Sequence, residues 1–122
     1  MGKDVVEVIR YFGPRKRLFK IHFRNVTAPL PHFTETLMDD GYDDMYKVMK
    51  ALVDVNFDGI VIPGHVTGLG DPPAGAQREG GARGTAGGGG APQRFRPSPG
   101  LAYSIGYLNA TLKAAQSNRR KA

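Results

Sequence analysis

The chain has 122 residues, a length that suits one domain with a modest hydrophobic core. Hydrophobic residues make up 40% and charged residues 23%, as in ordinary globular proteins, and the lack of cysteine excludes disulfides and thiolate metal ligands within the chain. The net charge of +6 is divided among separate clusters, a pattern typical of solvated basic segments, so nucleic acid is not expected as a partner.

The first part of the chain predicts a helix followed by a strand. Apolar residues at helical spacing indicate a helix that Asp4 caps and that Gly13-Pro14 ends. Residues Leu18–Phe23, with the sequence LFKIHF, form a short apolar run that is typical of a buried strand. A loop that contains two prolines follows this strand.

A second helix and a second strand are predicted next. Residues Tyr46–Val55 and the preceding Met45 have helical apolar spacing, and Ile60–Ile62 form another short buried-strand candidate. Acids precede the helix, where they suit the positive end of its dipole better than a cation site, because their spacing does not match an EF-hand. These acids are Asp39, Asp40, Asp43 and Asp44.

The remaining chain changes character twice. Residues 68–100 are rich in Gly and Pro and almost without apolar residues, which predicts a long disordered loop. Residues 101–116 return to helical spacing, and residues 117–122 form a basic tail that is expected to fray. The predicted inward face of this last helix comprises Leu101, Ile105, Leu108, Leu112 and Ala115.

The order of the elements indicates an α/β fold with parallel strands. Two parallel strands are too few for an independent sheet, since such strands are normally covered on both faces. We therefore expect residues 1–67 and the last helix to form the C-terminal portion of a (β/α)₈ TIM barrel, a fold that takes about 250 residues. Self-association of two half-barrels into a homo-oligomer is the alternative way to complete the sheet.

The residues at the predicted strand ends are candidates for chemistry, because barrel active sites lie there. His22 and His65 occupy similar places on the two strands and are candidate metal ligands, with hydrogen-bonded structural roles as the alternative. Arg24 could hold a substrate carboxylate or form a structural ion pair with a nearby acid. His32 is expected at the surface, and Tyr103 lies where an active-site loop would end.

Several motifs together resemble the mannonate dehydratase family. They are KIHFRNV, then FxExxxDDG followed by DM, then IVIPxHV, and finally GLAYSIGYLNA. The resemblance covers most of the chain outside the Gly-rich segment and the tail. It implies a xylose-isomerase-like barrel of a cytoplasmic enzyme that dehydrates D-mannonate, a sugar acid, to 2-keto-3-deoxy-D-gluconate in hexuronate breakdown.

The resemblance also implies a divalent metal, Mn²⁺ or Fe²⁺, which would stabilise the charge that develops beside the substrate carboxylate. His22 matches a histidine ligand of the family, and His65 matches a histidine implied in proton transfer. Tyr103 is the nearest match to the catalytic tyrosine. The aspartate ligand of the family is replaced by Gly64, and further ligands would lie upstream of this chain. We therefore expect an impaired or inactive centre in this chain alone.

A non-catalytic protein is the alternative from another functional class. In this interpretation the chain is a decayed gene product whose basic Gly-rich loop binds anionic partners. Gly64 and the arginines of residues 68–100 favour it. No apolar run approaches the length of a membrane span, so no membrane partner is expected.

Overall fold

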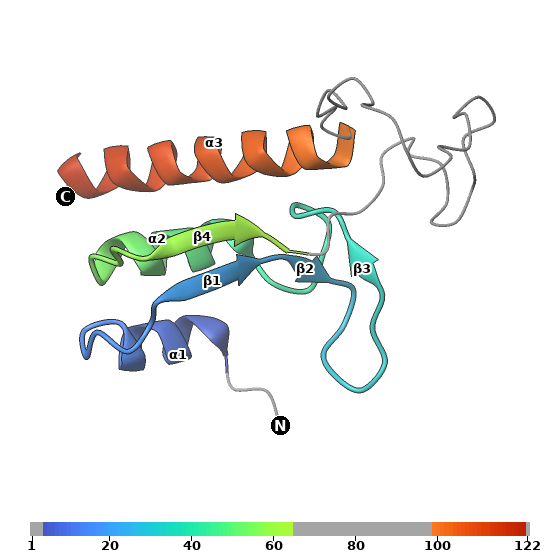
Figure 1. The fold of residues 1–122 in the computed structure, drawn as a ribbon, viewed down its shortest axis with the longest axis horizontal. Coiled ribbons are helices and arrows are strands. Elements are labelled where there is room, and N and C mark those ends of the chain that lie inside the picture. Colours follow the sequence, from blue (N-terminus) through green and yellow to red (C-terminus); the bar gives the residue numbers. More distant parts are fainter. Residues whose placement is uncertain (1–3, 65–98, 122) are drawn as a thin grey trace, which may run out of the picture.

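The computed structural model describes residues 4–64 and 99–121 and builds them as a small parallel sheet with helices packed against it (Figure 1). The helices are α1 (Val5–Phe12), α2 (Met45–Asp54) and α3 (Pro99–Lys121). The strands are β1 (Lys20–Phe23), β2 (Asn25–Val26), β3 (Glu35–Thr36) and β4 (Ile60–Pro63). None of the helices in the described ranges is both long and apolar enough to cross a membrane.

Strands β1 and β4 pair in parallel, as predicted, with Lys20 opposite Ile60 and Phe23 opposite Pro63. Because side chains alternate along a strand, this register separates the sheet into two faces. One face carries Phe23, which is 1% exposed and belongs to the core with residues of α1, α2 and α3. The other face carries Lys20 and His22, which are exposed, and Ile60, which is 63% exposed.

The α/β class with parallel strands and flanking helices is therefore confirmed. Within the described residues, no helix or strand covers the second face of the sheet, although parallel strands are normally buried on both sides. Because this face is open, the first predicted strand, Leu18–Phe23, is less buried than its apolar sequence indicates, and Phe19 is 74% exposed. The observed strand β1 is also shorter, since it begins at Lys20.

The predicted caps of the first helix are present at both of its ends. The Asp4 side chain accepts a hydrogen bond of 2.7 Å from the Val6 amide, and Gly13 ends α1 by donating its amide to the Ile9 carbonyl at 2.8 Å. A Cβ atom at Gly13 would lie 2.5 Å from the Val55 side chain, so only glycine permits this close approach of α1 to the end of α2.

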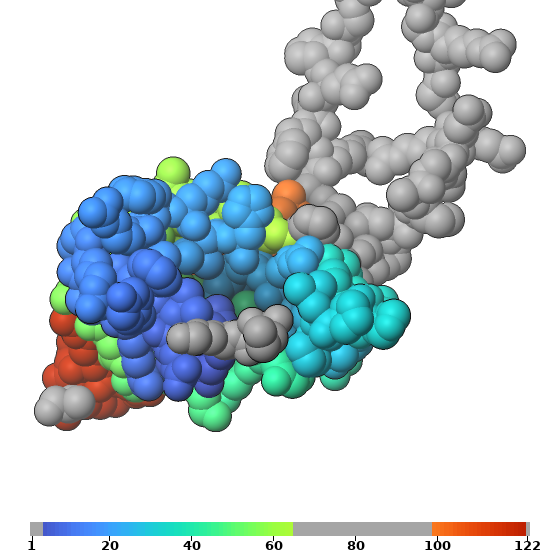
Figure 2. Space-filling model, turned by 90° about the horizontal axis from the view of Figure 1, so that it is seen from below, coloured from blue at the N-terminus to red at the C-terminus, as the bar shows by residue number. Residues whose placement is uncertain are grey.

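The short antiparallel pair of β2 and β3 was not predicted. It pairs Asn25 with Thr36 and Val26 with Glu35, and it turns the proline-containing segment into a closed loop. Figure 2 shows this loop as a cyan lobe beside α1. Each strand has two residues, too few for a period-of-two pattern to be visible in the sequence.

Helix α3 corrects two predictions. It begins at Pro99, so residues 99 and 100 are helical rather than part of the predicted disordered loop 68–100. It continues to Lys121, so residues 117–121 are helical rather than a frayed tail. The reason is tertiary contact: Arg119 Nη1 donates to the Val53 carbonyl and to Asn56 Oδ1, both at 2.7 Å, and these bonds tie the end of α3 to the end of α2. The predicted disordered loop lies, from residue 68 to residue 98, outside the described residues.

The inward face of α3 matches the predicted stripe only in part, since Ala115 is buried and Leu108 and Leu112 pack against the core. Ile105 is 45% exposed, whereas small residues of α3 are buried. Small side chains let α3 approach α2 closely. The buried small residues could not be recognised from the helical spacing of large apolar residues alone. The buried residues are Gly100, Ser104, Thr111 and Ala115, with Leu108, Leu112 and the two tyrosines packed partly against the core.

Candidate functional site

The carboxyl ends of β1 and β4 bring His22 and Gly64 together. A Cβ atom added at Gly64 would lie 3.3 Å from the His22 Cβ and 3.7 Å from its Nδ1. The backbone there is held by a 3.0 Å hydrogen bond from the Gly64 amide to the Phe23 carbonyl. A side chain at position 64 would therefore stand directly beside the His22 imidazole, on the open face of the sheet.

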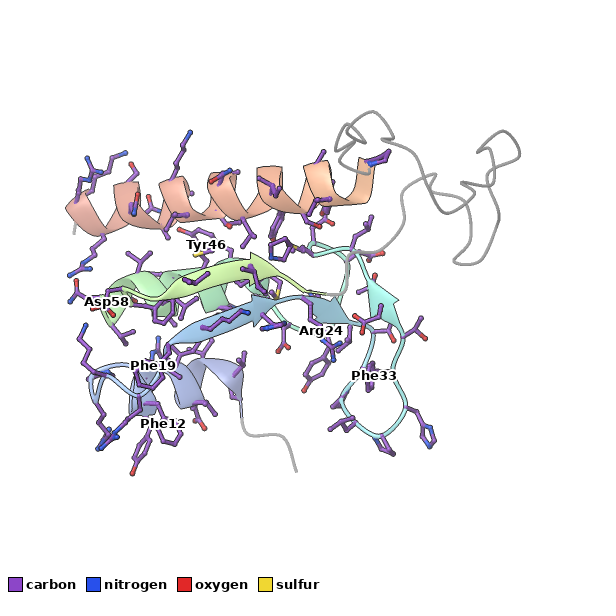
Figure 3. All side chains as sticks on the ribbon, in the orientation of Figure 1. Phe12, Phe19, Arg24, Phe33, Tyr46 and Asp58 are labelled. Atoms are coloured by element: carbon purple, nitrogen blue, oxygen red, sulfur yellow. The ribbon has the colours of Figure 1, made fainter. Side chains whose placement is uncertain are left out.

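Arg24 forms the ion pair that was the structural alternative for this residue. Its Nη1 lies 2.6 Å from Glu35 Oε1, and the two side chains are 34% and 31% exposed. The guanidinium also lies 5.7 Å from the centre of the Phe33 ring, and Figure 3 shows Arg24 by β2 and Phe33 in the β2–β3 loop. Arg24 thus links this loop to the end of β1.

Asn25 is the main polar residue at this end of the sheet, and the sequence did not reveal it. Its side chain is 1% exposed and donates to the Met38 carbonyl at 3.0 Å and to the Asp43 carbonyl at 2.8 Å. Its Oδ1 accepts from the amides of Val26 and Asp43, at 3.0 and 3.1 Å. Asn25 therefore fixes the segment that leads from β3 into α2.

The acids before α2 take part in local structure, and Asp44 caps the helix. Asp44 caps α2 by accepting from the Lys47 amide at 3.1 Å, and this hydrogen bond lowers the pKa of the Asp44 carboxyl. Burial, followed by the nearby Asp4 carboxylate, raises the pKa of Asp43. In the described part of the chain, no group of three or more His, Asp or Glu side chains could hold a metal ion.

Tyr103 lies on the helical side of the sheet. Its hydroxyl donates to the Asp39 carboxylate, its ring stacks on Tyr107 with centroids 6.1 Å apart, and it packs against the core. His22 is exposed on the opposite, open face. Tyr107 is partly buried and also packs against the core.

The Tyr103–Asp39 contact predicts an unusual phenol titration. Burial, and then the hydrogen bond to Asp39, raise the pKa of Tyr103 to about 12. Because the pKa is raised on folding, this group favours the folded state fully below its ordinary pKa near 10, and the benefit is lost as the pH rises towards 12.

We expect Asp39→Asn to move the titration of Tyr103, followed by absorbance at 295 nm, to lower pH, and to lower the pKa of Tyr107 as well, because the Asp39 charge also raises it. Part of the shift should remain, because burial is its larger cause. Asp40→Asn removes a neighbouring exposed carboxylate and is the matched control. An unchanged titration in Asp39→Asn would contradict the assigned contact.

The remaining histidines complete the survey of candidates. His65 lies outside the described residues, so its predicted role stays a prediction. His32 is exposed in the β2–β3 loop, as expected. Of the predicted site residues, the strand ends therefore bring His22 next to Gly64 and Arg24, while Tyr103 is held elsewhere by Asp39.

Comparisons with known proteins agree on one family. The family model of D-mannonate dehydratase (UxuA) matches residues 1–82. The mannonate dehydratases of Thermotoga petrophila and Thermotoga maritima are each 35% identical over 65 residues, which is 51% of this chain and 18% of theirs. The crystal structure of mannonate dehydratase from Streptococcus suis serotype 2 is similar with a TM-score of 0.66 and 28% identity, over 95% of this chain and 29% of that one. The chain thus spans less than a fifth of the length of these curated relatives.

Proposed function

Since the chain belongs to the mannonate dehydratase family, we propose that it carries the carboxyl-terminal strands of a lyase barrel that converts D-mannonate to 2-keto-3-deoxy-D-gluconate and water. The proposal rests on one observation: His22 and position 64 adjoin each other on the open face of a parallel strand pair, at the carboxyl ends of the strands. Active sites of (β/α)₈ barrels lie at this end.

The individual roles extend this proposal to named residues. His22 is the candidate metal ligand for Mn²⁺ or Fe²⁺, and His65 is the candidate for proton transfer at the carbon next to the substrate carboxylate. Arg24 would bind that carboxylate through guanidinium N–H groups other than those that bond to Glu35. Tyr103 is the candidate acid, and a raised pKa suits a protonated phenol, but its packing beside Asp39 favours a structural role.

The described residues do not fit a metal ion on their own. They contain no cluster of three candidate ligands, and Gly64 supplies no carboxylate beside His22. One imidazole alone binds a divalent cation weakly, because affinity grows with the number and geometry of the ligands. We therefore propose that this chain by itself is an impaired dehydratase.

A non-catalytic protein of the same ancestry is the second candidate, and Gly64 is the observation that favours it. A chain that has lost a ligand from an active site can keep its core, since the core residues of α1, α2 and α3 lie on the other face of the sheet. In this case a substitution of His22 would not affect the function of the protein.

A dehydration assay separates the two candidates. The purified 122-residue chain, with added Mn²⁺ and D-mannonate, is followed for the 2-keto-3-deoxy product, beside His22→Ala and the control His32→Ala. Product that disappears with a chelator and with His22→Ala, but not with His32→Ala, supports the lyase. A folded chain that forms no product with any of these additions favours the non-catalytic candidate.

A further inference from the structure

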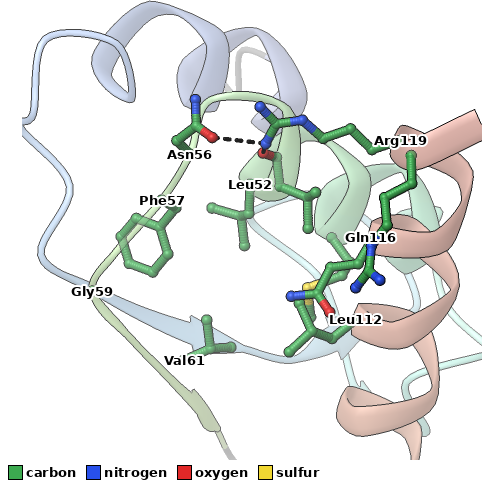
Figure 4. Close-up of a pocket in the computed structure, with 11 residues that line it drawn as sticks. Leu52, Asn56, Phe57, Gly59, Val61, Leu112, Gln116 and Arg119 are labelled. Atoms are coloured by element: carbon green, nitrogen blue, oxygen red, sulfur yellow. Dashed lines mark hydrogen bonds between the residues drawn. The ribbon is translucent and has the colours of Figure 1, made fainter. Parts of the chain in front are cut away.

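A pocket lies at the opposite end of the sheet from His22, where β4 begins (Figure 4). Its volume is about 670 Å³, within the range of about 300–1,000 Å³ that is usual for small-molecule sites. Apolar side chains from three elements line its floor: Leu52 of α2, Phe57 and Val61 before and within β4, and Leu112 of α3. Figure 4 shows these side chains converging from the two helices and the strand.

The rim of the pocket is polar and basic. Arg119 is anchored there by its two 2.7 Å hydrogen bonds to the Val53 carbonyl and Asn56 Oδ1, so its guanidinium is held in one place. Arg120 and Gln116 also line the pocket and are exposed. Among residues 4–64 and 99–121, Arg120 has no hydrogen-bonding or ionic partner, and it is available to a ligand.

We propose that this pocket binds a small amphipathic carboxylate, with its hydrocarbon part on the apolar floor and its carboxylate at Arg120. The carboxylate matches the positive rim, because guanidinium groups bind carboxylates by charge-assisted hydrogen bonds. The apolar floor favours a hydrocarbon over a sugar acid, because hydroxyl groups that reach Leu52, Val61 or Leu112 would lose water without gaining partners there. The site is therefore distinct from the proposed sugar-acid site, and it stands whether or not the chain is a lyase.

The chain-length dependence of binding tests the apolar floor. Binding of butanoate, hexanoate and hexanol to the 122-residue chain is measured from the methyl NMR shifts of Val61 and Leu112. Each methylene that reaches the floor should strengthen binding by about fourfold, so hexanoate should bind more tightly than butanoate. Hexanol has six carbon atoms like hexanoate but no charge, and one more of its carbons is a methylene that can reach the floor. It should therefore bind about threefold more weakly than hexanoate, since the extra methylene offsets part of the roughly tenfold loss of the charge-assisted bond.

Charge variants test the rim. Arg120→Gln should weaken hexanoate binding about tenfold, and added salt should weaken it as well. Arg17→Gln removes an exposed arginine outside the pocket and should leave the affinity unchanged. D-mannonate in excess should not displace hexanoate.

Three results would overturn the proposal. The first is the absence of saturable shifts at Val61 and Leu112 up to about 50 mM hexanoate, a concentration far above that of a specific site. The second is equal binding of hexanoate and hexanol, or equal binding by the wild type and Arg120→Gln. The third is displacement by D-mannonate, which would assign hexanoate to the sugar-acid site.

Discussion

Replacement of Asn25 by alanine should lower the free energy of unfolding by about 3 kcal/mol, a large part of the stability of a small domain. The side chain is 1% exposed and makes four hydrogen bonds to backbone groups of Val26, Met38 and Asp43. Alanine leaves these buried groups without partners and opens a cavity between β1 and the segment before α2. Urea denaturation followed by circular dichroism measures the loss.

Two further variants show whether the loss comes from this polar contact. Asn109→Ala removes an exposed asparagine of α3 and should change stability by less than about 0.5 kcal/mol. Gly41→Ala should be destabilising in the wild type, since its Cβ would lie 2.2 Å from the Asn25 Cγ, but much less so when Asn25 is already alanine. Additive effects of Asn25→Ala and Gly41→Ala would contradict the direct contact.

The helices and the parallel strands could be predicted because their signals are local. Asp4 and Gly13 bound α1 by short-range hydrogen bonds, and the apolar runs of β1 and β4 are typical of parallel strands. The length of α3 could not be predicted, since Arg119 stabilises its last turn through atoms of residues 53 and 56, far away in the sequence. Its buried face was predicted in part: Leu108, Leu112 and Ala115 pack in or against the core, whereas the small buried residues Ser104 and Thr111 were missed.

In the candidate site, too, some features could be predicted from the sequence and others could not. The neighbouring strand ends follow from the parallel order, so the sequence could predict that His22 lies close to the end of the second strand, but only the structure places position 64 beside it. Asn25 could not be recognised, because nothing in a single asparagine indicates four hydrogen bonds with residues up to 18 positions away. Tyr103 was assigned by its place after a long loop, whereas its partner Asp39 lies 64 positions earlier and only the folded chain brings them together.

Replacement of Gly64 by aspartate should strengthen Mn²⁺ binding by at least about tenfold, the size of effect that a supporting metal-site residue usually has. The Cβ of residue 64 would stand 3.7 Å from His22 Nδ1, so the carboxylate adds an anionic oxygen beside a candidate imidazole ligand. The 3.3 Å approach to the His22 Cβ requires a small shift of a side chain on the open face. Isothermal titration of Mn²⁺ measures the gain, with urea denaturation as the check on folding.

The gain in Mn²⁺ affinity must depend on the position of the added carboxylate and not on its charge alone. Gly106→Asp adds the same carboxylate to α3, where a Cβ meets nothing within 4 Å, and it should leave Mn²⁺ binding as it is in the wild type. Adding His22→Ala to Gly64→Asp should abolish the gain, because one carboxylate without the imidazole is again a single ligand. If Gly106→Asp and Gly64→Asp strengthened binding equally, the added charge would act through general attraction, and His22 would lose its assignment as a ligand. A gain confined to Gly64→Asp and lost with His22→Ala would instead mean that the strand ends still hold half of a metal site, which one missing carboxylate keeps weak.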